Sequence, residues 1–127
     1  MKKKSEQQIK ETIENLIQAG TRYDINQLEL IYHKSLQVIM INETGDKMIS
    51  NKQDFKDLFQ SKLNNGDAPL NTWALFNHID VQENKGHVII TRKVNLTGKE
   101  QKLILSIDLI KEENRWQVTR EIIVTQA

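Results

Sequence analysis

The C-terminal part of this chain, from Asn71 to Gln126, constrains its fold more than any other stretch. It contains four runs in which apolar and polar residues alternate, separated by three short polar turns. Alternation with a period of two is the pattern of a half-buried β-strand. Four such runs joined by short turns predict one antiparallel sheet with one apolar face.

The turns also predict the register of this sheet. We expect strands over residues 71–82, 87–96, 101–110 and 115–125, with turns at 84–85, 98–99 and 113–114. In the first hairpin this register sets Ile79 opposite Ile90. In the second it sets Ile90 opposite Ile107, and in the third it sets Leu109 opposite Val118. One face of all four strands then becomes apolar.

Apolar residues at helical spacing predict three helices before this sheet. We expect them over residues 5–19, from 24 to about 34 or 35, and over 52–63, with a short hairpin of strands 36–41 and 47–50 between the second and the third. Ser5, Asp24 and Asn51 are the expected helix caps. Gly20 lies where the first helix would end.

The order of these elements predicts an α+β fold. Helices and strands are segregated along the chain, as in domains whose helices cover one face of a mostly antiparallel sheet. With 127 residues, the chain has the length of a single domain, residues 1–127. We expect residues 1–4, which contain three lysines, to be a flexible tail.

Composition excludes several classes of function. A net charge of +1 provides no basic field for nucleic acid, and the absence of cysteine excludes disulfides and thiolate chemistry. No apolar run approaches the roughly 20 residues that span a membrane. The first helix has a polar face of mixed sign, which argues against membrane binding. We therefore expect a cytoplasmic protein that binds neither nucleic acid nor membrane.

Polar and amphipathic residues interrupt the predicted apolar face. In the predicted register Asn77 lies opposite Arg92, and Arg120 is near enough for the side chains to converge. An unpaired charge on an apolar face costs several kcal/mol, so each guanidinium needs an acceptor. One explanation is that the arginines extend to solvent or pair with a helix carboxylate such as Glu14 or Glu29.

The other explanation is a ligand pocket between the sheet and the helices. Arg92, Arg120 and Asn77 would hold an anionic or carbonyl-bearing small molecule. Tyr32, Trp73 and Trp116 would provide flat apolar walls. Aromatic residues at these spacings are also common in protein cores, so the pattern alone leaves both explanations open.

The opposite face of the predicted sheet is half apolar. Half-apolar outer faces commonly bury against a partner, so we expect a homodimer through this face. The candidate interface residues are Phe76, His78, Ile89, Ile104 and Ile123. His78 shares a row with Ser106 and Glu121, but three strand spacings separate it from Glu121 by about 14 Å, so the two cannot hydrogen-bond directly.

The familiar catalytic and cofactor motifs are absent from the sequence. Its three histidines are scattered, with no second ligand at metal-binding spacing, and its five glycines form no phosphate-binding loop. No nucleophile elbow occurs. We expect no metal, no cofactor and no assignable catalytic residue.

The run 23–33, YDINQLELIYH, and the capped third helix that begins NKQDF resemble nuclear transport factor 2-like proteins, as does the last strand, RWQVTRE. Within that superfamily the chain most resembles small bacterial proteins of the polyketide-cyclase-like or lumazine-binding-like type. The resemblance implies a cone-shaped fold, in which three helices pack on a curved, mixed and mostly antiparallel sheet of about six strands around a pocket. It also implies a homodimer through the sheet.

Members of this superfamily include ketosteroid isomerase, dehydratases, cyclases and proteins without known activity. The enzymes place an acid or a His–Asp pair in the pocket. Near the end of the second helix, where several carry a carboxylate, this chain has Lys34 and Ser35, and Asp108 falls on the predicted outer face.

Three functions stay open at this point. The first is a small-molecule-binding or accessory protein without catalysis. The second is an isomerase, cyclase or dehydratase that uses Tyr32 or His33. The third is a structural or protein-interaction dimer with a filled interior. A pocket of several hundred Å³ (on the order of a typical ligand site) in contact with both arginines would favour the first.

Overall fold

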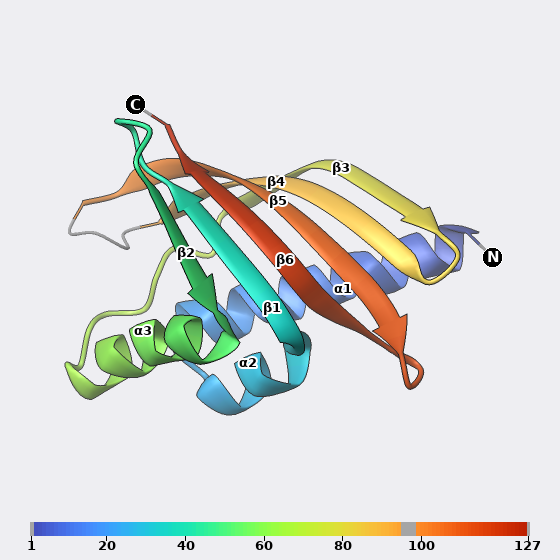
Figure 1. Cartoon of the computed structure of the whole chain (residues 1–127), viewed down its shortest axis with the longest axis horizontal. Helices are drawn as coiled ribbons and strands as arrows, with labels where there is room; N and C mark the ends of the chain where they lie inside the picture. The colour runs from blue at the N-terminus through green and yellow to red at the C-terminus, as the bar shows by residue number, and fades with distance from the viewer. Residues whose placement is uncertain (1, 95–98, 127) are drawn as a thin grey trace.

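The computed structural model describes residues 2–94 and 99–126, and these form three helices and six strands (Figure 1). In chain order they are α1 (Lys2–Thr21), α2 (Ile25–Ile31), β1 (Tyr32–Ile41), β2 (Lys47–Asn51), α3 (Lys52–Asn64), β3 (Ala74–Gln82), β4 (Lys85–Val94), β5 (Gln101–Glu112) and β6 (Arg115–Thr125).

The strands form one mixed sheet in the order β2-β1-β6-β5-β4-β3. Only the β1–β6 pair is parallel, and β2 and β3 are the two edges, so the sheet is not closed into a barrel. The sheet is strongly twisted, with α1 running along one face and α2 and α3 gathered at one end (Figure 1). This confirms the predicted α+β class.

The first helix is longer at both ends than its pattern predicts. It begins at Lys2, so residues 2–4 are helical rather than a tail and Ser5 is not its cap, while Met1 lies outside the described residues. It also continues through Gly20 to Thr21. Tyr23, with a φ of 57°, supplies the left-handed residue that follows the helix, which Gly20 was expected to supply.

The second helix is shorter than predicted. Asp24 caps it as expected, because its Oδ1 accepts the N–H of Gln27 at 3.3 Å. The helix ends at Ile31, because Tyr32 takes extended backbone angles and pairs with Val118 of β6. The third helix begins as predicted, with a capping box between Asn51 and Asp54.

The first two hairpins pair two residues away from the predicted register. The first turn lies at residues 83–84, where Glu83 has a φ of 57°, rather than at 84–85. Ile79 therefore lies opposite Val88 instead of Ile90, and Ile90 lies opposite Leu105 instead of Ile107. Because an even shift keeps each side chain on its face, the inner face of β4 and β5 is unchanged.

The register of the third hairpin agrees with the prediction at its turn, and part of the second hairpin lies outside the described residues. The turn at 113–114 is confirmed, and so is the pairing of Leu109 with Val118. The predicted end of the second strand at residues 95–96 and the Gly98 half of the second turn lie outside the described residues.

A β-bulge in each of two strands turns side chains over. In β3, Asn77 is an extra residue between Phe76 and His78, which places Phe76 opposite Ile90 on the inner face. Asn77 itself accepts a hydrogen bond from the Thr91 hydroxyl at 2.8 Å, on the outer face. Asn77 is therefore not opposite Arg92, which pairs with Ala74.

In β6 the extra residue is Thr119, between Val118 and Arg120. Up to Val118 the strand follows the predicted alternation. Beyond the bulge the faces exchange, so Glu121 points inward and the exposed Arg120 lies outward opposite Asp108. This one insertion decides which charge enters the core.

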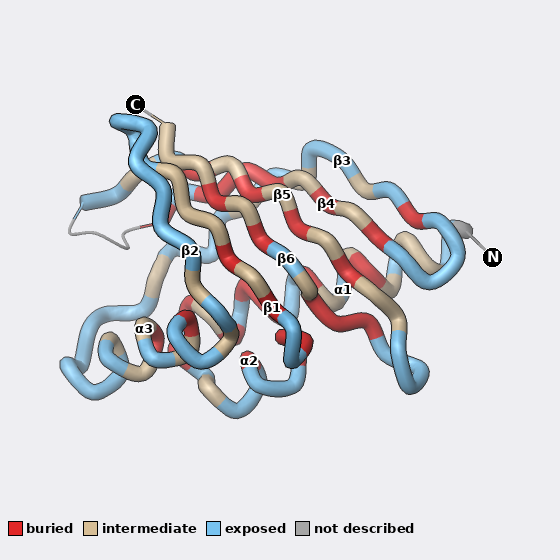
Figure 2. Tube along the Cα trace, viewed as in Figure 1, coloured by how far each residue is buried: buried red, intermediate tan, exposed pale blue. Residues whose placement is uncertain are grey.

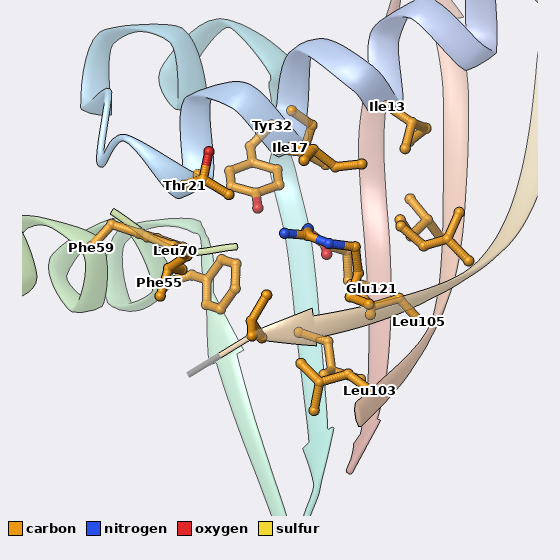
Figure 3. Close-up of a pocket in the computed structure, with 17 residues that line it drawn as sticks. Ile13, Ile17, Thr21, Tyr32, Phe55, Phe59, Leu70, Leu103, Leu105 and Glu121 are labelled. Atoms are coloured by element: carbon orange, nitrogen blue, oxygen red, sulfur yellow. The ribbon is translucent and has the colours of Figure 1, made fainter. Parts of the chain in front are cut away.

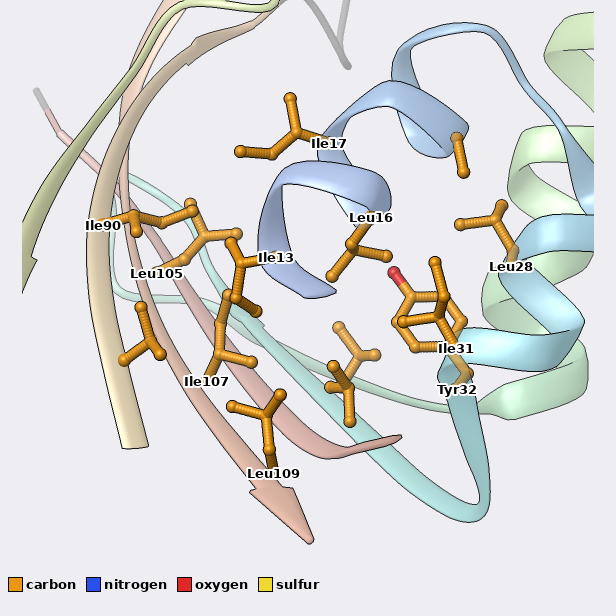
Figure 4. Packing of buried hydrophobic residues seen from close by; sticks show 14 of the residues in the cluster. Ile13, Leu16, Ile17, Leu28, Ile31, Tyr32, Ile90, Leu105, Ile107 and Leu109 are labelled. Atoms are coloured by element: carbon orange, nitrogen blue, oxygen red, sulfur yellow. The ribbon is translucent and has the colours of Figure 1, made fainter. Parts of the chain in front are cut away.

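The hydrophobic core lies between α1 and the inner face of the sheet (Figures 2 and 4). Ile13 of α1 is fully buried and points at Leu105 and Ile107 of β5 (Figure 4). At the other end Leu28 of α2 is equally buried. Within the described residues, no helix is long and apolar enough to cross a membrane.

Candidate functional site

A small cavity lies within the core, between the C-terminal half of α1, α3 and the inner face of the sheet (Figure 3). Its volume is about 60 Å³ and its walls are mainly apolar. Four polar side chains line it: Thr21, Tyr32, Arg92 and Glu121. The volume is far below the several hundred Å³ of typical drug-sized ligand sites, and it suffices for about two water molecules or a small organic molecule.

Glu121 is the unusual residue of this cavity. Its side chain is only 3% exposed, and its Oε2 has no hydrogen-bond partner within the described residues. Burial disfavours the charged form and raises the pKa of the Glu121 carboxyl to about 7, although Tyr32 and Arg92 oppose this shift. A carboxyl group with this pKa is present in both protonation states near neutral pH.

Tyr32 reaches the same point from the other side of the cavity (Figure 3). It is the first residue of β1 and is 2% exposed, and its hydroxyl hydrogen-bonds the Glu121 carboxyl. Burial, and secondly the negative charge of Glu121, raise the pKa of the Tyr32 hydroxyl well above its ordinary value. Tyr32 therefore stays neutral and acts as a hydrogen-bond donor.

Arg92 is held by the chain segment that precedes β3. Its Nε donates to the Trp73 carbonyl at 3.0 Å and its Nη2 to the Asn71 carbonyl at 2.7 Å. Burial lowers the pKa of the guanidinium, and the negative charge of Glu121 opposes that shift. An arginine remains charged at any ordinary pH, so Arg92 is the fixed cation of the site.

The segment held by Arg92 also closes the cavity on its α3 side. Leu70 lines the cavity, and its backbone N–H donates to the Thr21 carbonyl at 3.0 Å. The Tyr23 hydroxyl donates to the Ala68 carbonyl at 2.7 Å. Arg92 thus links this closing segment to the electrostatics of the cavity.

The structure brings together only two of the predicted pocket residues, Tyr32 and Arg92. Trp73 is 41% exposed and its ring stacks under the Lys93 ammonium, while Asn77 and Arg120 lie on the outer face. Trp116 is buried, but its Nε1 donates to Gln8 of α1 at 3.3 Å, away from the cavity. The prediction that Asn77 and Arg120 point inward with Arg92 is therefore wrong.

Of the five predicted interface residues, three lie on the outer face of the sheet and two lie on its inner face. His78, Ile89 and Ile104 lie on the outer face as expected. Phe76 lies on the inner side, where the Lys10 ammonium of α1 sits 5.5 Å from its ring. Ile123 is a core residue at 3% exposure, because the β6 bulge exchanges it with its neighbour.

Glu121 was predicted to lie on the outer face and was therefore missed as a residue of the site. Strict alternation through β6 places Arg120 inward and Glu121 outward, and a bulge at Thr119 reverses this. Because the two charged residues are adjacent, either pattern buries one of them. The alternation therefore contains no signal that favours the acid.

The chain has the nuclear transport factor 2-like fold, as comparison with solved structures shows. A protein of unknown function from Shewanella baltica OS155 with this fold is 15% identical, with a TM-score of 0.79 over 98% of this chain and 95% of that chain. One from Silicibacter pomeroyi DSS-3 is 15% identical, with a TM-score of 0.77 over 94% and 93%. One from Rhodospirillum rubrum, described as of unknown function in nutrient uptake, is 14% identical, with a TM-score of 0.70 over 94% and 98%.

No protein-family model matches the sequence, and no curated protein does. The polyketide-cyclase-like subtype therefore stays a prediction. Among the described residues, no group of three or more histidine and carboxylate side chains is arranged to hold a metal ion.

Proposed function

We propose that the protein binds a small, neutral, mostly apolar molecule with one carbonyl or hydroxyl oxygen, in the cavity beside Glu121. The observation that carries this proposal is the buried, unpartnered Oε2 of Glu121 in an otherwise apolar cavity. A buried polar atom without a partner costs about 1–3 kcal/mol, and a ligand that supplies the missing hydrogen bond recovers that energy.

The charges around the cavity favour a neutral ligand. Arg92 and ionised Glu121 already compensate each other, and Arg92 is further satisfied by two backbone carbonyls. A ligand carbonyl would accept a hydrogen bond from protonated Glu121, and a ligand hydroxyl would donate a hydrogen bond to its ionised form. The cavity volume of about 60 Å³ limits the ligand to a few heavy atoms unless the segment around Leu70 moves.

Small neutral ketones, with small alcohols and carboxylates as comparison series, test this function. We expect a ketone to perturb the methyl NMR signals of Ile90 and Ile107, which line the cavity, and to bind more tightly below about pH 7, where Glu121 is protonated. Glu121→Gln should keep binding and lose its pH dependence, whereas Glu121→Leu should lose binding. If no compound perturbs these methyl groups, the filled-interior alternative is correct.

A second candidate function is proton transfer, favoured by the raised pKa of Glu121. A carboxylate with a pKa near 7 can remove a proton next to a bound carbonyl, while the Tyr32 hydroxyl turns from Glu121 to the ligand and donates to the carbonyl oxygen. Exchange of the α-protons of a bound ketone in D₂O would measure this. Glu121→Gln should slow the exchange about 100-fold, and equal rates in both proteins would leave only binding.

We also propose that two copies pair through the outer face of the sheet. A row of paired residues crosses that face and is mostly apolar: Ile49, Ile39, Ile122, Ser106, Ile89 and His78. Ile104→Lys should convert the dimer to a monomer in sedimentation analysis, and Glu14→Lys, at an exposed position of α1 on the other side of the sheet, is the matched control. A dimeric Ile104→Lys protein would place the interface elsewhere.

The cytoplasmic location stays a prediction.

A further inference from the structure

A second polar cluster lies on the outside of the wall that Tyr32 lines. His33, the next residue, contacts a serine on one side and a carboxylate on the other. Its Nδ1 is 2.8 Å from the Ser35 Oγ, and its Nε2 is 2.8 Å from the Glu112 Oε1. The three side chains form one continuous hydrogen-bonded series.

The partners of His33 determine its tautomer. The backbone N–H of Ser35 donates to Nδ1 at 3.1 Å, so Nδ1 is an acceptor in the neutral ring. Nε2 then carries the proton and donates a hydrogen bond to the Glu112 carboxylate. Because Nδ1 is an acceptor, the Ser35 hydroxyl also donates its proton in a hydrogen bond to Nδ1. The lone pairs of the Ser35 Oγ then stay available for attack on a substrate.

The local backbone explains why these groups meet. Tyr32 pairs with Val118 and Gln37 with Arg120, so residues 33–36 of β1 face the single bulged residue Thr119 of β6. This irregular stretch turns Ser35 toward solvent and leaves His33 only 9% exposed. A buried base between an exposed hydroxyl and a carboxylate is the arrangement of an activated nucleophile.

A surface groove of about 370 Å³ adjoins the cluster. His33, Lys34 and Glu112 line it, together with Leu30 and Arg115. Ser35 lies beside this groove and is not part of its lining, so an ester would place its acyl or alcohol chain in the groove while its carbonyl meets the exposed Ser35 hydroxyl. The groove carries both acidic and basic side chains, and so gives no reason to require a charged substrate.

We propose that Ser35 is a nucleophile that takes an acyl group from activated carboxylic esters, with His33 as the general base and Glu112 as a positioning residue. In the first step the Ser35 Oγ attacks the ester carbonyl and its proton passes to His33 Nδ1. The alcohol then leaves with that proton, and the acyl group remains on Ser35. Water releases the acyl group as a carboxylic acid by the same proton transfers.

The outer face of the sheet offers an internal control. Ser106 Oγ lies 3.3 Å from the Nε2 of His87, whose Nδ1 lies 2.6 Å from Asp108. These residues have the same chemistry, but the serine contact is longer and the histidine side chain is 37% exposed. We expect Ser106 to be much less reactive than Ser35.

The test is acylation of the whole protein by p-nitrophenyl acetate, with release of p-nitrophenolate followed by absorbance and the acetyl group located by peptide mapping. We expect one acetyl group on Ser35. The acylation rate should fall at least about 100-fold in both Ser35→Ala and His33→Asn, and should stay unchanged in Ser106→Ala. Glu112→Gln should lower the rate at saturation by a larger factor than it changes the substrate concentration for half-maximal rate, because Glu112 positions His33 as well as lining the groove.

Two results would overturn the proposal. The first is acetylation of lysines or Ser106 without acetylation of Ser35. The second is an equal rate in Ser35→Ala, which would mean that Ser35 is not the nucleophile. Because Ser35 is exposed, a lowered rate in this variant would not come from misfolding. Circular dichroism of His33→Asn checks that loss of its rate does not come from unfolding. None of these results depends on the cavity at Glu121.

Discussion

Two adjacent residues, Tyr32 and His33, take part in polar clusters on opposite sides of the same wall. Inside, Tyr32 meets Glu121 in an apolar cavity, and burial raises the pKa of the carboxyl to about 7. Outside, His33 meets Glu112, whose side chain is 48% exposed. Both clusters join an aromatic ring to a glutamate. The comparison teaches that solvent access, rather than residue type, makes Glu121 the unusual acid.

The largest expected effect concerns the cation of the inner cluster. Arg92→Leu removes two hydrogen bonds to the segment before β3 and leaves the charge of Glu121 uncompensated. We expect a loss of about 3–5 kcal/mol in the free energy of unfolding, measured by urea denaturation. Arg120→Leu, at an exposed position on the outer face, should change stability by at most about 0.5 kcal/mol. Equal effects would mean that Arg92 has no special role.

The pH dependence of stability sharpens the same comparison. The pKa of Glu121 rises from 4.5 to about 7 on folding, so the folded state binds more protons than the unfolded state between those values. The contribution of Glu121 is therefore fully present below about pH 4.5 and is lost as the pH rises through 7.

Glu121→Gln removes this titration and should not show the loss. Relative to the variant, the natural protein should lose on the order of 2 kcal/mol of stability between about pH 5 and about pH 8. Urea denaturation at a series of pH values measures the difference. Parallel curves for the two proteins would mean that Glu121 is solvated.

The smallest effect belongs to the outer cluster. Glu112 is half exposed, so its pairing with His33 is weakened by solvent. Glu112→Gln should change the free energy of unfolding by less than about 1 kcal/mol in thermal or urea denaturation. A loss of unfolding free energy comparable to that of Arg92→Leu would show that the fold depends on the outer cluster as much as on the inner one. The two clusters would then not differ in their effect on stability.

The sequence predicted the fold well because long alternating strands and helix caps are local signals. The β6 boundaries, the cap at Asp24 and the capping box at Asn51 were all foreseeable from neighbouring residues. The turn at Glu83 shifted the first hairpin by two residues without moving any side chain to the other face. Even-numbered errors of this kind leave the core prediction intact.

The site was less predictable because it depends on single extra residues. The bulge at Thr119 moved Arg120 out and Glu121 in, and the bulge at Asn77 moved Phe76 in. The inward position of Arg92 was predicted correctly, because the pairing of β4 with β5 has no bulge and the alternation holds. A bulge is a property of the paired strands, so alternation within one strand cannot reveal it.

The pKa of the Glu121 carboxyl, measured directly, tests the inner cluster most closely. Carbon-detected NMR of glutamate side chains across a pH series would follow it, with the Glu121→Gln variant identifying the signal. The structure predicts a midpoint of about 7, well above the ordinary value of a glutamate carboxyl group. A midpoint near the ordinary value of 4.5 would contradict the buried acid on which the binding proposal rests.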